Sequence, residues 1–180
     1  MGGTVAFGTV GTPLGRMLVA VSEAGVLAVD FRDDPAVRAR TAERSGLVPV
    51  EDPDRTAAAV EQLAAYFAGE LREFALPVDW RLTTRVQRRI LSCLRETVPY
   101  GSVVTYGRLG ERSGTGVPAR AVGQVMGANP IPVIVPCHRV VAENGLGGYS
   151  GGTGPDVKRR LLALEGVLPP ALDFGPAEGP

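Results

Sequence analysis

The feature that most constrains the fold is a change in hydrophobic pattern near residue 80. Before it lie three short runs rich in β-branched and apolar residues: Thr4 to Val10, Arg16 to Ser22 and Val26 to Arg32. Turn-forming residues, such as Gly11-Thr12-Pro13, separate these runs, which is typical of an antiparallel meander. After residue 80 the apolar residues recur at helical spacing. The sequence therefore predicts a small sheet followed by a mainly helical part.

One helix is predicted to cover the sheet. The stretch from Asp33 to Asp54 is polar and contains prolines, and we assign no element to it. Beyond it, apolar residues fall at positions i, i+3, i+4 and i+7 before Gly69: Val60, Leu63, Ala64 and Phe67. This spacing indicates an amphipathic helix that packs on the sheet.

A second helix opens the later part of the chain. Thr84 followed by Gln87 has the form of a capping box, and the helix must end before Pro99. Four residues mark its predicted buried stripe: Val86, Ile90, Cys93 and Leu94. Cys93 is accordingly interpreted as a small core residue.

A helix-turn-helix layout follows. Thr105 to Arg112 allows a short helix, and Pro118 to Gly127 a second one with proline near its first turn. One face of the second helix has one arginine and otherwise few bulky side chains. It consists of Arg120, Gly123, Gln124 and Gly127. Each glycine costs a helix about 1 kcal/mol relative to alanine, so this face must serve the close approach of another body. A DNA groove and a packed helix both satisfy that requirement.

The charges are segregated along the chain, although 19 basic and 19 acidic residues cancel overall. Residues 1–80 carry 7 basic and 12 acidic residues, a net charge of −5, whereas residues 81–165 carry 12 basic and 5 acidic residues, a net charge of +7. Arginine suits phosphate contact because its planar fork matches phosphate geometry. A GC-rich genome also favours arginine over lysine, but it does not explain the asymmetry.

Several classes of protein are excluded by composition. The longest uninterrupted apolar stretch, Pro130 to Cys137, is far shorter than the roughly 20 residues of a membrane helix. The N-terminus lacks the pattern of a signal peptide, so we expect cytoplasmic residence. Two cysteines and one histidine can build neither a disulfide framework nor the usual Cys/His zinc site. We therefore expect no metal and no cofactor, and any cysteine chemistry is predicted to be thiol chemistry.

The segment around Cys137 is the candidate for that chemistry. Prolines at 130, 132 and 136 do not fit a central strand, so the sequence predicts a buried, irregular segment that presents Cys137 in a fixed pose. His138 and Arg139 follow directly, and a base or positive charge favours the thiolate. Adjacent side chains do not normally face each other, so His138 is expected to act through a water molecule. From spacing alone, a structural thiol beside a chance histidine is an equal alternative.

A resemblance over nearly the whole chain decides between them. Its central motif is Pro136-Cys137-His138-Arg139-Val140, preceded by Arg120-Ala121-Val122-Gly123 and Asn129-Pro130 and followed by Gly148-Tyr149-Ser150-Gly151-Gly152 and Leu161-Leu162-Ala163-Leu164-Glu165-Gly166. Gln87, Val98 to Gly101 and Tyr106 also match. The sequence resembles the O6-alkylguanine-DNA alkyltransferases, the methylated-DNA-protein-cysteine methyltransferases.

The resemblance implies an α+β protein. A small N-terminal antiparallel sheet with a helix, ribonuclease H-like, is expected over residues 1–80. A mainly helical domain with the helix-turn-helix and the active-site cysteine is expected over 81–166, and a flexible tail over 167–180.

The resemblance also implies a reaction. Cys137 would irreversibly accept the alkyl group from O6-alkylguanine, or O4-alkylthymine, in DNA, so that each molecule acts once. His138 would take the Cys137 proton through water, Glu165 would orient His138, and Asn129 would hold the segment. Substrate-binding residues would be Tyr106, Val140, Tyr149 and Ser150.

The implied partner is double-stranded DNA that contains alkylated guanine, bound by a monomer, with cooperative binding left open. The second helix of the motif would enter the minor groove, and Arg120 would replace the extruded base. The other expected DNA contacts are Ala121, Gly123, Gln124 and Gly127.

Some residues depart from the family pattern. Gly107 and Gly110 weaken the first helix of the motif, and Pro118 puts the start of the second helix in question. Thr153-Gly154-Pro155 lengthens the loop after Ser150. Two other functions compete with DNA dealkylation: a lesion-binding module without transfer, which the presence of Cys137 and His138 disfavours, and a cysteine hydrolase that turns over repeatedly.

Overall fold

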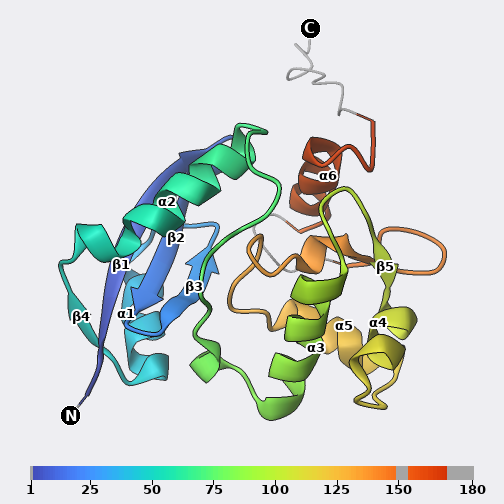
Figure 1. Ribbon diagram of the computed structural model, residues 1–180, viewed down its shortest axis with the longest axis horizontal. Coiled ribbons are helices and arrows are strands. Elements are labelled where there is room, and N and C mark those ends of the chain that lie inside the picture. The colour runs from blue at the N-terminus through green and yellow to red at the C-terminus, as the bar shows by residue number, and fades with distance from the viewer. Residues whose placement is uncertain (1, 149–153, 170–180) are drawn as a thin grey trace, which may run out of the picture.

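A four-stranded sheet forms the first half of the molecule and helices form the second half (Figure 1). The computed structural model describes residues 2–148 and 154–169. We call residues 2–80 the sheet region and the remaining described residues the helical region. The predicted α+β class, with a small N-terminal sheet and a mainly helical second part, is confirmed.

The sheet has the strand order β3-β2-β1-β4. The predicted meander is present as β1 (Thr4–Thr12), β2 (Gly15–Ser22) and β3 (Gly25–Asp30), with antiparallel pairing throughout. Alternating side chains point to opposite faces, so β2 sends Met17 and Val19 into one buried cluster and Ala20 into another.

Two elements between Asp33 and Asp54 were missed by the sequence analysis. They are α1 (Pro35–Ser45) and the short strand β4 (Val48–Val50), which pairs in parallel with β1. No element was assigned to this polar, proline-containing stretch, whereas Pro35 and Pro53 begin helices. Proline fits the first turn of a helix because that turn needs no amide hydrogen from it. An aspartate caps each of these helices, Asp34 for α1 and Asp52 for α2.

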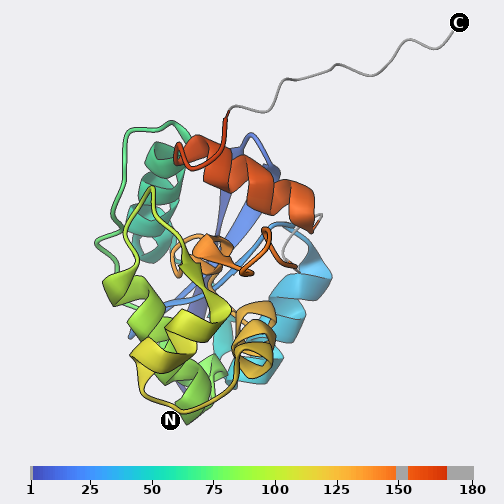
Figure 2. The same ribbon diagram turned by 90° about the vertical axis from the view of Figure 1, so that its right-hand side faces the viewer.

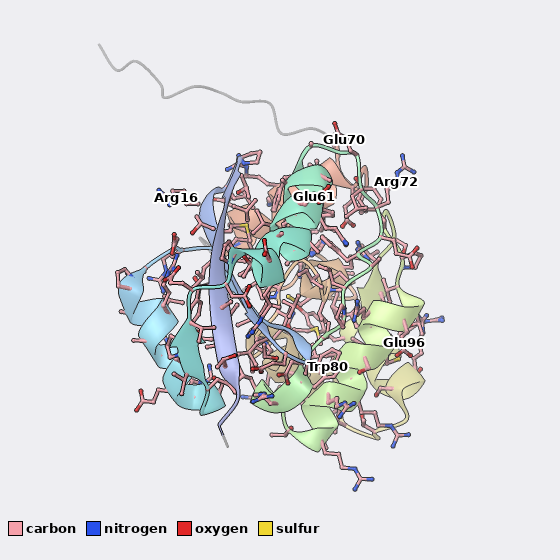
Figure 3. All side chains as sticks on the ribbon, turned by 60° about the vertical axis from the view of Figure 1, so that its left-hand side comes forward. Arg16, Glu61, Glu70, Arg72, Trp80 and Glu96 are labelled. Atoms are coloured by element: carbon pink, nitrogen blue, oxygen red, sulfur yellow. The ribbon has the colours of Figure 1, made fainter. Side chains whose placement is uncertain are left out.

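The helix α2 (Pro53–Phe67) lies on the sheet as predicted, but its buried stripe is rotated. Leu63 and Phe67 are buried as expected, whereas Ala64 is exposed and Val60 is only partly buried. Tyr66 is fully buried instead. Figure 3 shows α2 along the sheet with the labelled Glu61 on its outer side.

A single 3-10 turn, η1 (Trp80–Leu82), spans the boundary between the two regions, and α3 (Arg85–Thr97) follows it in the helical region. The capping box of Thr84 and Gln87 is confirmed, since both reciprocal hydrogen bonds are present. The predicted stripe is wrong at Val86, which is 47% exposed, and Cys93 is only partly buried. The stripe faces the core through Ile90, Leu91 and Leu94 instead.

The predicted helix-turn-helix consists of α4 (Tyr106–Ser113) and α5 (Ala119–Gly127). Pro118 is the N-cap residue of α5, so this helix starts just after it. Gly110, which weakens α4 in isolation, is required by packing. A Cβ there would lie 2.9 Å from the Val117 carbonyl oxygen and 3.2 Å from a Val122 methyl group. The glycine allows α4 and α5 to approach closely.

The chain then passes through η2 (Cys137–Arg139), which lies next to α6 (Pro155–Leu164). Between them β6 (Val140–Val141) pairs in parallel with β5 (Val104–Thr105). Figure 2 shows the segment with η2, in orange, between α6 and α5.

The two regions share one hydrophobic core. A single cluster of buried residues runs from the sheet through α3, α4 and α5 to α6. The edge strand β3 also holds the helical region directly, because the Val29 amide donates a hydrogen bond to the Pro130 carbonyl oxygen at 2.9 Å. Among residues 2–148 and 154–169, no helix has the length and apolar character that crossing a bilayer would need.

Candidate active site

The segment that precedes Cys137 is rigidly held. All residues from Ile131 to Val140 are buried. The Asn129 side chain donates to the Val135 carbonyl oxygen and accepts from the Ile131 amide, both at 3.0 Å. Val133 has φ of 72°, a left-handed conformation that is strained for a β-branched residue. Such strain persists only where the surrounding contacts enforce it, and here it fixes the path that leads to Cys137.

Cys137 is only 4% exposed, yet it lines a cavity of about 580 Å³. A volume of this size is in the range of small-molecule sites. The other lining residues come mainly from α4 and α5: Tyr106, Ala119, Arg120, Gly123, Met126, Gly127 and Gly148. The thiol is thus shielded from bulk solvent but opens onto the bare face of the second helix of the motif.

Tyr106, the first residue of α4, forms one wall of this cavity. A Cβ at Gly123 would touch the Tyr106 ring at 3.8 Å, so the helix face runs directly over it. The Tyr106 hydroxyl donates to the Gly148 carbonyl oxygen at 3.3 Å. Burial, together with the charge of a Cys137 thiolate, raises the pKa of Tyr106, which keeps its hydroxyl protonated.

Lys158, the only lysine of the sequence, is a site residue that the sequence analysis missed. It is 1% exposed, and its ammonium group donates to the Val140 carbonyl oxygen at 2.6 Å and lies 5.7 Å from the centroid of the Tyr106 ring. Burial lowers the pKa of Lys158 to about 8, and the charge of a Cys137 thiolate opposes this shift. A single lysine in a chain whose other basic residues are all arginine was the sequence feature that could have indicated a special role for Lys158.

The opposite side of the cysteine turn is a buried ionic network. His138 is fully buried, and its Nε2 lies 2.8 Å from Oε1 of Glu165, the residue that caps α6. Arg139 binds both oxygens of the same carboxylate, with Nε 2.9 Å from Oε2 and Nη2 2.8 Å from Oε1. Burial raises the pKa of Glu165, but the hydrogen bonds from His138 and Arg139 outweigh it and lower the pKa to about 2. Glu165 is therefore ionised.

An ionised Glu165 fixes the tautomer of His138. A carboxylate only accepts hydrogen bonds, so Nε2 carries the proton and Nδ1 of the neutral ring is an acceptor. Burial lowers the pKa of His138, against the hydrogen bond and the charge of Glu165, which favours this neutral ring. His138 Nδ1 is buried and has no hydrogen-bond partner among the described residues.

The structure brings together most of the predicted site residues. Cys137, Tyr106, Arg120, Gly123 and Gly127 line one cavity, and His138 contacts Glu165. Ala121 and Gln124 belong to α5 but do not line that cavity, and Val140 is buried in β6. Some predicted residues lie outside the described residues: Tyr149, Ser150, Thr153 of the lengthened loop, and residues 170–180 of the tail. Arg139, expected to favour the thiolate, instead binds Glu165. Tyr66, whose hydroxyl donates to Glu165, was not predicted from the sequence either.

Two family models match the chain. Residues 5–80 match the ribonuclease-like domain of 6-O-methylguanine DNA methyltransferase, and residues 85–167 match its DNA binding domain. A methylated-DNA-protein-cysteine methyltransferase of Mycolicibacterium paratuberculosis is 42% identical over 93% of this chain and 96% of its own length. One of Methanosarcina acetivorans is 39% identical over 86% of this chain and 94% of its own length.

Solved structures agree in fold. The structure of Mycobacterium tuberculosis OGT in complex with DNA has a TM-score of 0.75 and 39% identity, covering 92% of this chain and 96% of that chain. The O6-methylguanine-DNA methyltransferase of Pyrococcus kodakaraensis has a TM-score of 0.66 and 28% identity, covering 91% and 100%. The predicted resemblance is confirmed: the chain belongs to the O6-methylguanine-DNA methyltransferase family, DNA-binding enzymes that repair DNA by transferring the methyl group of O6-methylguanine to a cysteine.

Proposed function

We propose that Cys137 is the cysteine that accepts the alkyl group. The observation that carries this proposal is the position of its side chain, which is buried yet opens into a cavity of about 580 Å³ beside α5. In the transfer the Cys137 sulfur forms a bond to the alkyl carbon while the bond from that carbon to O6 breaks. The electron pair of the broken bond passes to the guanine, which takes up a proton.

His138 is the base that prepares the thiolate. Its Nδ1 has no hydrogen-bond partner in the described part of the chain and is an acceptor in a buried site, where an ordered water molecule is the usual partner. Such a water would carry the proton from Cys137 to Nδ1, while Glu165 stabilises the imidazolium through Nε2. Asn129 keeps the segment in position through its two backbone hydrogen bonds.

The leaving base is held by the cavity walls. The Tyr106 hydroxyl stays protonated and would turn from the Gly148 carbonyl oxygen to donate toward the guanine ring, where negative charge develops. Val140 is buried beside Cys137 in β6, and we assign base binding to Tyr149 and Ser150 on the family resemblance alone. The smaller ring of an O4-alkylthymine presents the same alkyl ether and is a second substrate in this proposal.

DNA binds along α5. A base stacked inside a duplex cannot reach a thiol that is 4% exposed, so the damaged nucleotide must leave the stack. Arg120, exposed at the start of α5 and at the cavity, would fill the vacated space from the minor groove. Ala121, Gly123, Gln124 and Gly127 complete the groove contact.

The reaction is stoichiometric and irreversible in this proposal. The product is a thioether, and returning its alkyl group would require a thiolate to leave from an unactivated carbon. One monomer therefore repairs one lesion.

We also propose a domain division at 80/81 and 166/167 and a cytoplasmic location. Limited proteolysis would test the boundary at 80/81.

Intact mass measurement after mixing with O6-methylguanine duplex tests the function. We expect one added methylene per molecule, on the peptide with Cys137, and a burst of repair equal to the protein present. Cys93→Ser is the matched control, since it removes the other thiol and should keep the adduct. Unchanged mass with retained DNA binding would indicate a lesion-binding module, and product beyond one equivalent would indicate a hydrolase.

A further inference from the structure

Tyr66 connects the sheet region to the ionic network of the active site. It belongs to α2, is fully buried, and its hydroxyl donates a hydrogen bond to Glu165 Oε1 at 2.7 Å across 99 residues of sequence. The same hydroxyl oxygen lies 3.5 Å from His138 Nε2. A residue of the sheet region thus touches both members of the His138–Glu165 pair.

The oxygen that Tyr66 contacts is the one that His138 uses. Oε1 of Glu165 accepts from Tyr66, from His138 Nε2 at 2.8 Å and from Arg139 Nη2 at 2.8 Å. Oε2 accepts from Arg139 Nε at 2.9 Å and from the Gly101 amide at 3.4 Å. Donors that share one acceptor oxygen each take part of its negative charge, so the bond to His138 is weaker with Tyr66 present than without it.

The Tyr66 ring is fixed independently of that hydrogen bond. Its aromatic neighbours lie at centroid distances of 5.3 to 6.1 Å: Phe67, Phe74 and Tyr100. Since ring packing does not need the hydroxyl, its removal leaves the fold of this region in place. Burial and the charge of Glu165 raise the pKa of Tyr66, so the hydroxyl remains a donor at all working pH values.

Resting on the proposed roles of Cys137 and His138, we propose that Tyr66 is a positioning residue for alkyl transfer, which holds Glu165 Oε1 and shares its charge so that His138 stays neutral. A neutral ring is what the reaction requires, because only then can Nδ1 accept the Cys137 proton. The sheet region thereby contributes to the reaction itself as well as to the support of the fold.

The sign of the expected effect follows from the surrounding charges. Glu165 favours the imidazolium, whereas burial and the charges of Arg139 and Lys158 disfavour it. Arg139 and Tyr100 also face Tyr66, and Cys137 adjoins His138 in η2. Tyr66→Phe removes a hydrogen-bond donor that reduces the negative charge on Glu165 Oε1, and it changes none of these other groups. The pKa of His138 must therefore rise in Tyr66→Phe.

The chain has a single histidine, which makes the measurement direct. The ¹⁵N and ¹³C signals of the ring report the titration of His138 without ambiguity. We expect Tyr66→Phe to raise its pKa by about half a unit or more, a roughly threefold change in the protonation constant. The acid limb of the single-turnover rate at saturating O6-methylguanine DNA should move by the same amount, with DNA affinity unchanged.

Tyr100→Phe is the matched control. It removes the same atom from the neighbouring ring, but that hydroxyl donates to the Leu164 carbonyl oxygen at 3.0 Å and does not reach the carboxylate. We expect its His138 titration and rate profile to equal those of the wild type. An unmoved His138 signal in Tyr66→Phe, or an equal shift in Tyr100→Phe, would overturn the inference.

Two further measurements distinguish a failure of the proposed role of Tyr66 from a folding defect and from a failure of the proposed function. Replacing Tyr66 by 3-fluorotyrosine makes a stronger donor and should move the His138 titration in the opposite direction, even if the phenylalanine variant does not fold. The absence of an adduct on wild-type Cys137 would remove the proposed function and this inference with it. An adduct on the wild type, with an unmoved titration in both Tyr66 variants, would remove only the inference.

Discussion

Cys137 and His138 are adjacent in the chain, yet their side chains face two different environments. Cys137 lines a cavity whose walls include Tyr106, the small residues of α5 and the exposed Arg120. His138 lies in an enclosed network in which Tyr66, Arg139 and Glu165 are also buried. The first environment admits another molecule, and the second fixes charges. The 3-10 turn of η2 separates these tasks by sending consecutive side chains in different directions.

The largest expected effect comes from removing only the Cys137 sulfur, which tests whether the cavity side carries the reaction. Cys137→Ala should abolish alkyl transfer completely and leave binding to O6-methylguanine duplex within about twofold, because the cavity and α5 do not need the sulfur. Single-turnover repair and fluorescence anisotropy measure the two quantities, with Cys93→Ala as the control that retains both. Loss of binding in Cys137→Ala would show that the residue also shapes the DNA-binding face.

Removing one charge from the enclosed side should have a different result, a loss of stability. Glu165→Gln keeps the shape of the side chain but leaves the guanidinium of Arg139 buried without its counter-charge. Breaking a buried pair in this way costs about 3–5 kcal/mol, which urea unfolding would measure. The control is Glu61→Gln on the exposed side of α2, expected to change stability by less than about 0.5 kcal/mol. Similar costs for both would mean that the network contributes no stability.

The two environments also differ in how far the sequence could predict them. On the cavity side, local patterns singled out the glycines of α5 and the segment around Cys137, and the family resemblance decided between their alternative interpretations. The enclosed side depends on contacts between distant positions. Tyr66 appeared as a member of an ordinary amphipathic helix, and nothing within a helical turn of it indicates a carboxylate 99 residues away.

Local signals were also misinterpreted. The polar stretch from Asp33 to Asp54 contains two Asp-Pro pairs, and each of them starts a helix with aspartate as its cap. An aspartate cap followed by proline is a recognisable start of a helix, and it was not used when this stretch was left without an element. The strand β4 has three residues and depends on pairing with β1, so no periodicity was available to reveal it.

On the cavity side, Arg120 should matter for duplex DNA rather than for the chemical step. Arg120→Ala is expected to slow repair of O6-methylguanine duplex about 10-fold or more, because the extruded state loses the side chain that occupies its gap. Reaction with the base O6-benzylguanine, which needs no extrusion, should change less than about twofold. Arg108→Ala, which removes an exposed arginine of α4 outside the cavity, controls for the loss of positive charge. Equal losses with both substrates would contradict the extrusion role.

The smallest expected effect concerns pH and the enclosed side. The pKa of His138 is lower in the folded protein than its ordinary value of 6.5, mainly because of burial. The unfolded chain then binds the proton more readily, so the contribution of His138 to the free energy of unfolding is constant above about pH 6.5 and falls below it, by at most about 1.4 kcal/mol per pH unit for one proton. The pKa of Glu165, lowered to about 2, adds a further loss only as the pH falls below its ordinary value of 4.5.

Because the chain has one histidine, the slope between pH 6.5 and 5 can be assigned to a single residue. Urea unfolding at pH 7.5, 6.5, 5.5 and 5.0 would measure it, and His138→Gln should remove it while leaving the steeper loss at lower pH that the carboxylates cause. A slope that survives unchanged in His138→Gln would mean that the imidazole binds a proton as readily in the folded protein as in the unfolded chain. The contrast with Cys137 would then be lost, because the proton acceptor of the reaction would no longer be held neutral by its surroundings.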